Sequence, residues 1–301
     1  MMEAAIEVLL GAQNEDGGWG FVKGKHSNTE STAFALMALK SLGEGKFNPP
    51  LEAGLNWLLK RQKDDGSWPL NDGSQQSSWT TPIAVLTLLS FQDQRDRALS
   101  AVKWLLQQEG KKPSWIASFL WRLSPANKMP ELDPNLTGWS WTPGAFSWVE
   151  PTSYALMAIK MLRAHLAGTN VQERIQQGEM LIYDRMCENG GWNYGNSRVL
   201  EGEPLWPYPD VTAVALIALQ DRAKSRANQV SLQALDTMMR EGPSGMALGW
   251  GILCLEVYGR NVGQLKEILA KNFQKTGFLG ETKPLALSVL AFGDGPKLFR
   301  I

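Results

Sequence analysis

The stretch "LLGAQNEDGGWG" (Leu9–Gly20) recurs later in the chain as "LLKRQKDDGSWP" (Leu58–Pro69). Both copies share the pattern Q-x-x-x-G-x-W, and "IYDRMCENGGWNYG" (Ile182–Gly195) is a looser third copy with Met186 in place of the glutamine. Each copy follows an amphipathic helical segment. Its glycines can supply the left-handed residue that ends a helix, and its tryptophan can then fold back onto the helix ends. The pattern indicates a chain built from repeated helical units.

A second kind of segment follows each motif after a polar loop. These segments are apolar on all sides, as is typical of fully buried helices, whereas segments before the motifs, such as "LEAGLNWLLKRQ", have one polar face. The alternation predicts an all-α fold, an α/α toroid in which amphipathic outer helices surround buried inner helices. The apolar segments are "TAFALMALKSLG" from Thr32, "TPIAVLTLLSF" from Thr81, "TSYALMAIKML" from Thr152, "TAVALIALQ" from Thr212 and "KPLALSVLAFG" from Lys283.

The repeat predicts about six helical hairpins. We expect their inner helices to begin near Ser31, Thr80, Pro151, Val211, Gly245 and Thr282. Residues 111–148 interrupt the period and are either a seventh, shortened hairpin or an irregular insertion that closes one mouth of the barrel. No linker rich in serine or proline divides the chain, so we expect one α/α-toroid domain over residues 1–301.

Composition excludes several classes of function. The 30 basic and 30 acidic residues cancel without forming blocks, which argues against a nucleic-acid groove or a polybasic membrane anchor. Cys187 and Cys254 lie far apart without a CxxC neighbour, and the first residues lack the features of a signal peptide. We therefore expect a soluble, cytoplasmic protein with reduced cysteines, and leave open whether it touches a membrane surface.

The Q-x-x-x-G-x-W motifs and the T-[AS]-x-A-L-x-A-[LI] start of the apolar segments resemble the repeats of the squalene/oxidosqualene cyclase and protein prenyltransferase superfamily. The resemblance covers nearly the whole chain in organisation, with two intact motifs. It implies an α6/α6 toroid whose central cavity holds a polyisoprenoid or another long apolar substrate.

The resemblance also points to one of the superfamily's chemistries. The two histidines lie in no constellation with zinc-ligand spacing, and no DDxxD magnesium motif is present, so we expect no metal and no cofactor. Class II cyclases protonate their substrate with the middle aspartate of D-x-D-D-T-A. Aligning that motif on Thr212–Ala213 places Asp210 at the donor position, with Tyr208 and Val211 in place of the flanking acids.

Other repeats carry an acid at the same offset, namely Glu30, Glu150 and Glu281. A carboxylate there can simply accept backbone N–H bonds at a helix start, which stabilises a helix by roughly 0.5–2 kcal/mol, and this structural role stays an alternative for all of them. Glu150 follows the aromatic stretch "GWSWTPGAFSW", so Asp210 and Glu150 are the two candidate catalytic acids.

Thirteen tryptophans are unusually many, and several precede the inner helices. Aromatic faces attract carbocations by about 0.5–2 kcal/mol without offering a nucleophile, so these side chains are candidate substrate contacts. The alternative is that some only pack between hairpins. The candidates are Trp79, Trp141, Trp148, Trp206, Tyr208 and Trp250.

The resemblance implies a terpene cyclase-like enzyme that cyclises or isomerises a polyisoprenoid after protonation, with a hydrophobic isoprenoid as its small-molecule partner. The alternatives are a toroid that binds an isoprenoid or lipid without turnover, and a scaffold for protein interactions. Full triterpene cyclases have two toroids and this chain has room for one. A partner domain or a second copy in a homodimer is therefore a further expectation.

Overall fold

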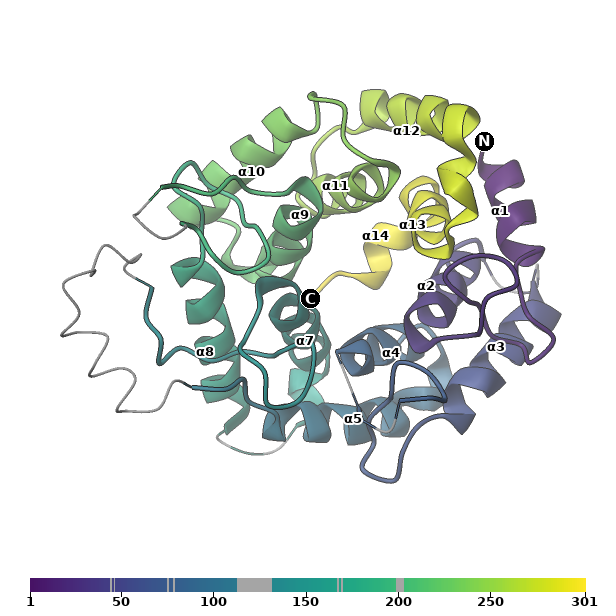
Figure 1. The fold of residues 1–301 in the computed structure, drawn as a ribbon, viewed down its shortest axis with the longest axis horizontal. Coiled ribbons are helices and arrows are strands. Elements are labelled where there is room, and N and C mark those ends of the chain that lie inside the picture. Colours follow the sequence, from purple (N-terminus) through teal and green to yellow (C-terminus); the bar gives the residue numbers. More distant parts are fainter. Residues whose placement is uncertain are drawn as a thin grey trace.

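The computed structural model describes residues 1–43, 45, 47–74, 76–77, 79–112, 132–166, 168, 170–198 and 203–301. Over these ranges the chain folds into helices without β-strands, arranged as two concentric rings (Figure 1). The predicted all-α toroid is confirmed.

The inner ring is closed. Each inner helix packs against the next one along the chain, and the last packs against the first. Every inner helix begins within about two residues of its predicted start. The starts were predicted well because a long, uninterrupted apolar segment is a strong sequence signal for a buried helix. The inner helices are α2 (Thr29–Lys40), α4 (Thr80–Leu88), α7 (Val149–Leu162), α9 (Pro209–Ala218), α11 (Gly245–Val257) and α13 (Thr282–Phe292).

The outer ring is made of amphipathic helices that bury one stripe against the inner ring. They are α1 (Met2–Leu10), α3 (Asn48–Lys60), α5 (Arg95–Gln107), α8 (Asn170–Asp184), α10 (Arg226–Met238) and α12 (Gly263–Thr276). Short 3-10 turns lie at Gln92–Gln94, Arg163–His165, Gln220–Arg222 and Gly277–Gly280.

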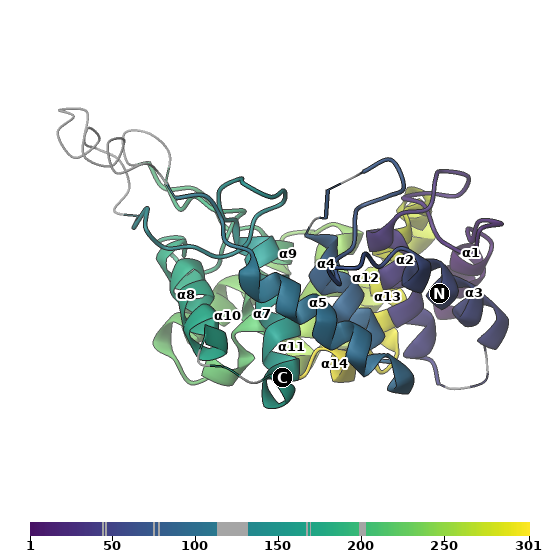
Figure 2. The ribbon, with the colours of Figure 1, turned by 90° about the horizontal axis from the view of Figure 1, so that it is seen from below.

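The two faces of the toroid differ. The loops that lead into the inner helices lie on one face, at the top in Figure 2, which we call the loop face. The short helix α14 (Gly295–Leu298) lies inside the ring near the opposite face and contacts α2, α11 and α13. The space enclosed by the inner helices, here called the bore, therefore receives part of the chain itself.

Tryptophans fasten four outer helices, α1, α3, α5 and α8, to the inner helix that follows each of them. The Trp19 indole N–H donates to the Leu9 carbonyl at 2.8 Å, and the Trp19 backbone N–H donates to the Thr32 hydroxyl at 2.9 Å. Trp68, Trp139 and Trp192 each make the same pair of bonds. Trp139 is thus a structural equivalent of the motif, within the segment where the sequence pattern is interrupted.

Hydrogen bonds also link successive hairpins. The Thr29 backbone N–H donates to the Leu70 carbonyl of the second hairpin. In the same way the Thr282 N–H donates to the Phe21 carbonyl, at 2.8 Å, and the Thr282 hydroxyl donates to the Gly20 carbonyl at 2.6 Å. The last hairpin therefore joins the first in the same way as the first joins the second.

Two predictions about the organisation stay open. Within the 111–148 interruption, residues 113–131 lie outside the described residues, so its nature as a hairpin or an insertion stays a prediction. The single-domain assignment over 1–301 also stays a prediction. Across the described part of the chain, no helix has the length and apolar character needed to cross a bilayer.

Candidate functional site

Four charged residues occupy one structural position at the start of inner helices. Glu30, Glu150, Asp210 and Lys283 are each the second residue of α2, α7, α9 and α13 respectively. The interhairpin bonds made by the residue before each glutamate and before Lys283 establish the equivalence. The sequence pattern had aligned Glu281 with the acids. That alignment was wrong by two residues, since Glu281 is the exposed N-cap of α13.

Lys283 bridges two of these acids. Its Nζ lies 2.8 Å from Glu30 Oε1 and 3.6 Å from Glu150 Oε1. Helix α13 neighbours α2 and α11, and α7 neighbours α4 and α9, so the contact between Lys283 and Glu150 spans the bore (Figure 1). The side chains are largely buried, with exposed fractions of 18% for Lys283, 9% for Glu30 and 12% for Glu150.

The environment of the Glu150 carboxyl favours its protonated form. Burial raises its pKa above the usual range, and the charges of Glu30 and Asp210 raise it further, against the opposing effects of Lys283 and Tyr154. The Tyr154 hydroxyl donates a hydrogen bond of 3.1 Å to Glu150 Oε1. Burial alone would lower the pKa of Lys283, but Glu30 and Glu150 hold it well above its usual range, so the ammonium stays charged.

An aromatic cluster lies one helical turn beyond the charged position. It is formed by Phe34, Tyr154 and Trp250, from the alternating helices α2, α7 and α11, together with Phe299 after α14. The Trp250 ring centroid lies 5.8 Å from that of Phe34, 6.0 Å from Tyr154 and 5.4 Å from Phe299. Lys283 Nζ lies 5.3 Å from the Phe34 ring centroid, so the charged and aromatic layers are in contact.

The other predicted aromatic residues lie around the loop face. Trp206 and Tyr208, before α9, are 76% and 47% exposed, and the Tyr208 ring lies 5.5 Å from Tyr194. Trp148 packs against the backbone of Gly195. Trp79 and Trp141 meet edge to face at 4.7 Å. Of the predicted set, Trp250 alone is in the central cluster, and the substrate-binding role of the set stays a prediction.

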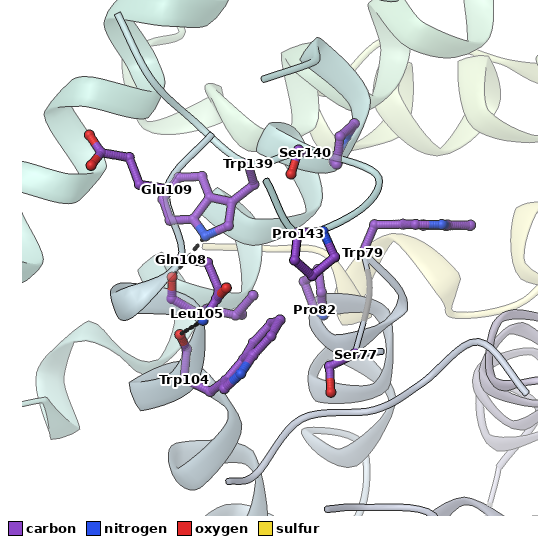
Figure 3. Close-up of a pocket in the computed structure, with 11 residues that line it drawn as sticks. Ser77, Trp79, Pro82, Trp104, Leu105, Gln108, Glu109, Trp139, Ser140 and Pro143 are labelled. Carbon is purple, nitrogen blue, oxygen red and sulfur yellow. Dashed lines mark hydrogen bonds between the residues drawn. The ribbon is translucent and has the colours of Figure 1, made fainter. Parts of the chain in front are cut away.

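A slot on the loop face runs past Trp79 and is shown in Figure 3. It is lined by Pro82, Trp104, Trp139 and Pro143, and Glu109 lies at its edge. Hydrogen bonds from Lys112 and Thr137 lower the pKa of the Glu109 carboxyl. The cavity is small, with a volume of about 30 Å³.

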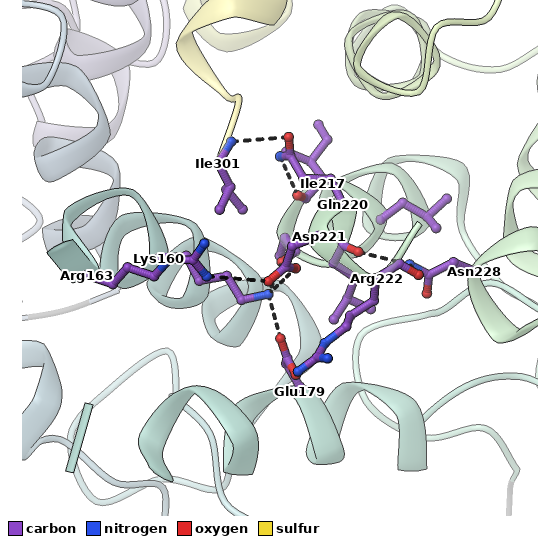
Figure 4. Close-up of polar contacts among 12 residues, drawn as sticks. Lys160, Arg163, Glu179, Ile217, Gln220, Asp221, Arg222, Asn228 and Ile301 are labelled. Carbon is purple, nitrogen blue, oxygen red and sulfur yellow. Dashed lines mark hydrogen bonds and ion pairs between the residues drawn. The ribbon is translucent and has the colours of Figure 1, made fainter. Parts of the chain in front are cut away.

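A second buried lysine, Lys160, anchors the opposite end of the helices (Figure 4). Its Nζ lies 2.7 Å from Glu179 Oε1 and 2.7 Å from Asp221 Oδ1, and donates to the Ala218 carbonyl at 2.8 Å. Nearby, the Gln220 side chain donates to the Phe299 carbonyl at 2.7 Å and accepts from the Ile301 N–H at 3.2 Å. This network holds the segment after α14 in the bore.

Lys283, Tyr154 and Phe34 are site residues that the sequence reasoning missed. One signal pointed to Lys283, since a basic residue in the first turn of an apolar helix is electrostatically unfavourable. Among the described residues, no group of three or more His, Cys, Asp or Glu side chains is arranged to hold a metal ion.

The arrangement agrees with comparisons to known proteins. Residues 1–74 match the family model described as the squalene-hopene cyclase C-terminal domain. A search of curated protein sequences found no significant match. The chain is therefore similar to the class II terpene cyclase-like repeat superfamily over its first hairpins, as the motifs indicated.

Solved structures extend the likeness in fold to most of the chain. The type II terpene cyclase MstE from Scytonema, without ligand, is 17% identical with a TM-score of 0.54, over 91% of this chain and 77% of that one. A protein from Actinoplanes is 14% identical with a TM-score of 0.55, over 92% and 80%. The GH76A alpha-1,6-mannanase from Salegentibacter sp. HEL1_6 is 10% identical with a TM-score of 0.58, over 100% of both chains. These matches show an α/α toroid of the kind that both terpene cyclases and mannanases use.

Proposed function

We propose that the chain is a terpene cyclase-like enzyme in which Glu150 protonates a polyisoprenoid and so starts its cyclisation or isomerisation. The observation that carries the proposal is the position of the Glu150 carboxyl, which is buried at the edge of the Phe34–Tyr154–Trp250 cluster with its pKa raised. A carboxylic acid kept neutral by burial is the group that can deliver a proton to an apolar substrate.

In the proposed protonation step, Glu150 both gives the proton and takes one back, so protons and charges balance. Ammonium and phenol donors both contact Glu150 Oε1, so the proton of the neutral carboxyl belongs on Oε2. Transfer of that proton to an alkene carbon forms a C–H bond from the π electrons and leaves a carbocation and a carboxylate. Lys283 stabilises the carboxylate, and the aromatic faces stabilise the cation. Return of a proton from a neighbouring carbon of the substrate restores both the alkene and the acid.

Asp210 is the alternative acid under the same proposal. It holds the equivalent position on α9, beside α7, and its charge acts on Glu150. We favour Glu150 because its side chain contacts Tyr154 of the central aromatic cluster.

The rim of the loop face is the proposed entry for the substrate. Trp206 and Tyr208 expose large apolar surfaces before α9, and Trp79, Trp141 and Trp148 lie on the loops before α4 and α7. Such exposed apolar surfaces fit the capture of an isoprenoid chain. The MstE complex with its substrate, geranylgeranyl dihydroxybenzoate, guides the choice of compounds to test.

The test is incubation of the protein with squalene, geranylgeraniol, geranylgeranyl diphosphate and geranylgeranyl dihydroxybenzoate, followed by product analysis by mass spectrometry. We expect Glu150→Gln to reduce product formation by about 100-fold or more, as loss of a general acid does. Glu281→Gln is the matched control, because Glu281 begins an inner helix but is exposed. Loss of product in Asp210→Asn with full activity in Glu150→Gln would assign the acid to Asp210 instead.

A second candidate is a toroid that binds an isoprenoid or lipid without turnover. The observation that favours it is that Phe299 packs against Trp250, so protein side chains occupy the centre of the bore. Tight binding of a test compound without product in any variant would support this function. Neither binding nor product would favour a protein-interaction scaffold.

A further inference from the structure

Lys283 places a positive charge in the first turn of an inner helix, where the helix dipole is unfavourable for a cation. The N-terminus of a helix carries a partial positive charge that favours acids, and Glu30, Glu150 and Asp210 follow that rule. Lys283, at the same position on α13, breaks it, and its side chain is largely buried as well. Local rules of this kind are broken mainly where a function depends on the exception.

The two contacts of Lys283 are unequal. Glu30 Oε1 lies at 2.8 Å, within the range of a charge-assisted hydrogen bond, whereas Glu150 Oε1 lies at 3.6 Å. Glu150 Oε1 is instead within hydrogen-bond distance of the Tyr154 hydroxyl. One ammonium thus forms a full ion pair with Glu30 and leaves Glu150 incompletely compensated.

We propose that Glu30 and Lys283 form a positioning pair, in which Glu30 holds the ammonium and so leaves the acidic proton on Glu150 across the bore. The inference rests on the proposed function, because it explains how one of two similar carboxyls becomes the proton donor. Lys283 acts through the two glutamates and needs no contact with the substrate.

The charged groups that act on Glu150 come from every side of the mouth. Burial is the main reason that the pKa of Glu150 is raised, and the groups around it adjust that pKa in either direction. Among the described residues these are Lys283 on α13, Glu30 on α2, Asp210 on α9, Tyr154 on α7 and, near Asp210, the Tyr194 phenol.

Removing Glu30 and removing Lys283 should have opposite effects. In Glu30→Gln the ammonium keeps only Glu150 as a near partner, so Glu150 should ionise at lower pH. Activity that needs the neutral acid should then fall at a pH lower by about one unit, roughly a tenfold loss above that pH. In Lys283→Met no cation favours the carboxylate, so the fall should move to higher pH.

The double variant Glu30→Gln/Lys283→Met separates positioning from folding. It lacks both the ammonium and its preferred partner, so burial again keeps Glu150 neutral and the activity lost in Glu30→Gln should return. A merely structural role predicts instead that the double variant is at least as impaired as either single one. The control is Glu281→Gln, whose pH profile should match the wild type.

A readout that needs no turnover keeps this inference apart from the proposed function. The titration of Glu150 can be followed by carbon NMR in protein labelled at glutamate side-chain carboxyls, with Glu150→Gln to assign the signal. A lowered midpoint in Glu30→Gln and a raised one in Lys283→Met would support the inference even if no substrate is converted. An unchanged Glu150 midpoint in both variants would overturn it, whether or not the enzyme is active.

Discussion

Two lysines are buried between carboxylates at opposite ends of the inner helices, and they differ in how completely they are paired. Lys160, in the last turn of α7, has three acceptors at 2.7–2.8 Å and no exposed surface. Lys283, in the first turn of α13, has one acceptor at 2.8 Å and a second at 3.6 Å.

The difference distinguishes a structural contact from a candidate site. A cation near a helix C-terminus, such as Lys160, is favoured by the helix dipole, and two carboxylates and a backbone carbonyl lie within 2.8 Å of its Nζ. Lys283 is placed against the dipole and leaves Glu150 partly uncompensated. Complete pairing fixes a geometry, whereas incomplete pairing leaves a carboxyl able to change its protonation state.

The largest effect on stability should come from Lys160. We expect Lys160→Met to lower the free energy of unfolding by about 3–5 kcal/mol, because it leaves Glu179 and Asp221 without the cation between them. Urea denaturation measures the change. The control is Lys297→Met, whose lysine is 72% exposed and pairs on the surface with Asp294, and it should change stability by less than about 0.5 kcal/mol. If Lys160→Met were as stable as this control, the buried ion pairs of Lys160 would contribute no more to stability than a surface ion pair.

The corresponding change at the loop face should cost less. We expect Lys283→Met to lower the free energy of unfolding by about 1–2 kcal/mol, because Glu30 and Glu150 lie at helix N-termini that favour negative charge. One of the two acids can also take up a proton once the cation is gone. The measurement is the same urea titration, made beside Lys160→Met. Equal losses in the two variants would show that both lysines serve as structural pairs.

The smallest expected effect is a dependence of stability on pH. The pKa of Glu150 in the folded protein lies above its ordinary value of 4.5, so folding favours the protonated form. The stability that this provides is present below pH 4.5 and is lost as the pH rises through the folded-state pKa. It amounts to about 1.4 kcal/mol for each pH unit that separates the folded-state pKa from the unfolded-state pKa. The difference in unfolding free energy between wild type and Glu150→Gln should therefore fall with rising pH. A difference that rises with pH instead would show that Glu150 is ionised in the fold.

Most of the fold could be predicted because it repeats. A helix that is apolar on all sides is recognised from its own residues, as the accurate starts of α4 and α11 show. The equivalent of the motif at Trp139 escaped notice because Asp133 and Thr137 replace both its glutamine and its glycine, although its hydrogen bonds match those of Trp19. The local sequence pattern therefore predicts the helices more reliably than the tryptophan contacts that connect them.

The candidate site was predicted only in part, because its contacts cross the ring. Glu150 and Asp210 follow from their place at helix starts, but the approach of Lys283 to Glu150 depends on how the closed ring sets α13 opposite α7. The same holds for Phe299, which reaches Trp250 from α14. Because the sequence alignment of α13 was wrong by two residues, it matched Glu281 with the other acids and overlooked Lys283.

The bonds from Thr282 to Gly20 and Phe21 also bear on how the protein folds. These acceptors of the first hairpin bond to the start of α13, so the bonds cannot form until Thr282 has been synthesised. Contacts between such distant residues form slowly because a long loop must close first. We therefore expect closure of this seam between the first and last hairpins to be a late step of folding. Glu30 and Lys283 meet at this seam, so the candidate site forms with that step.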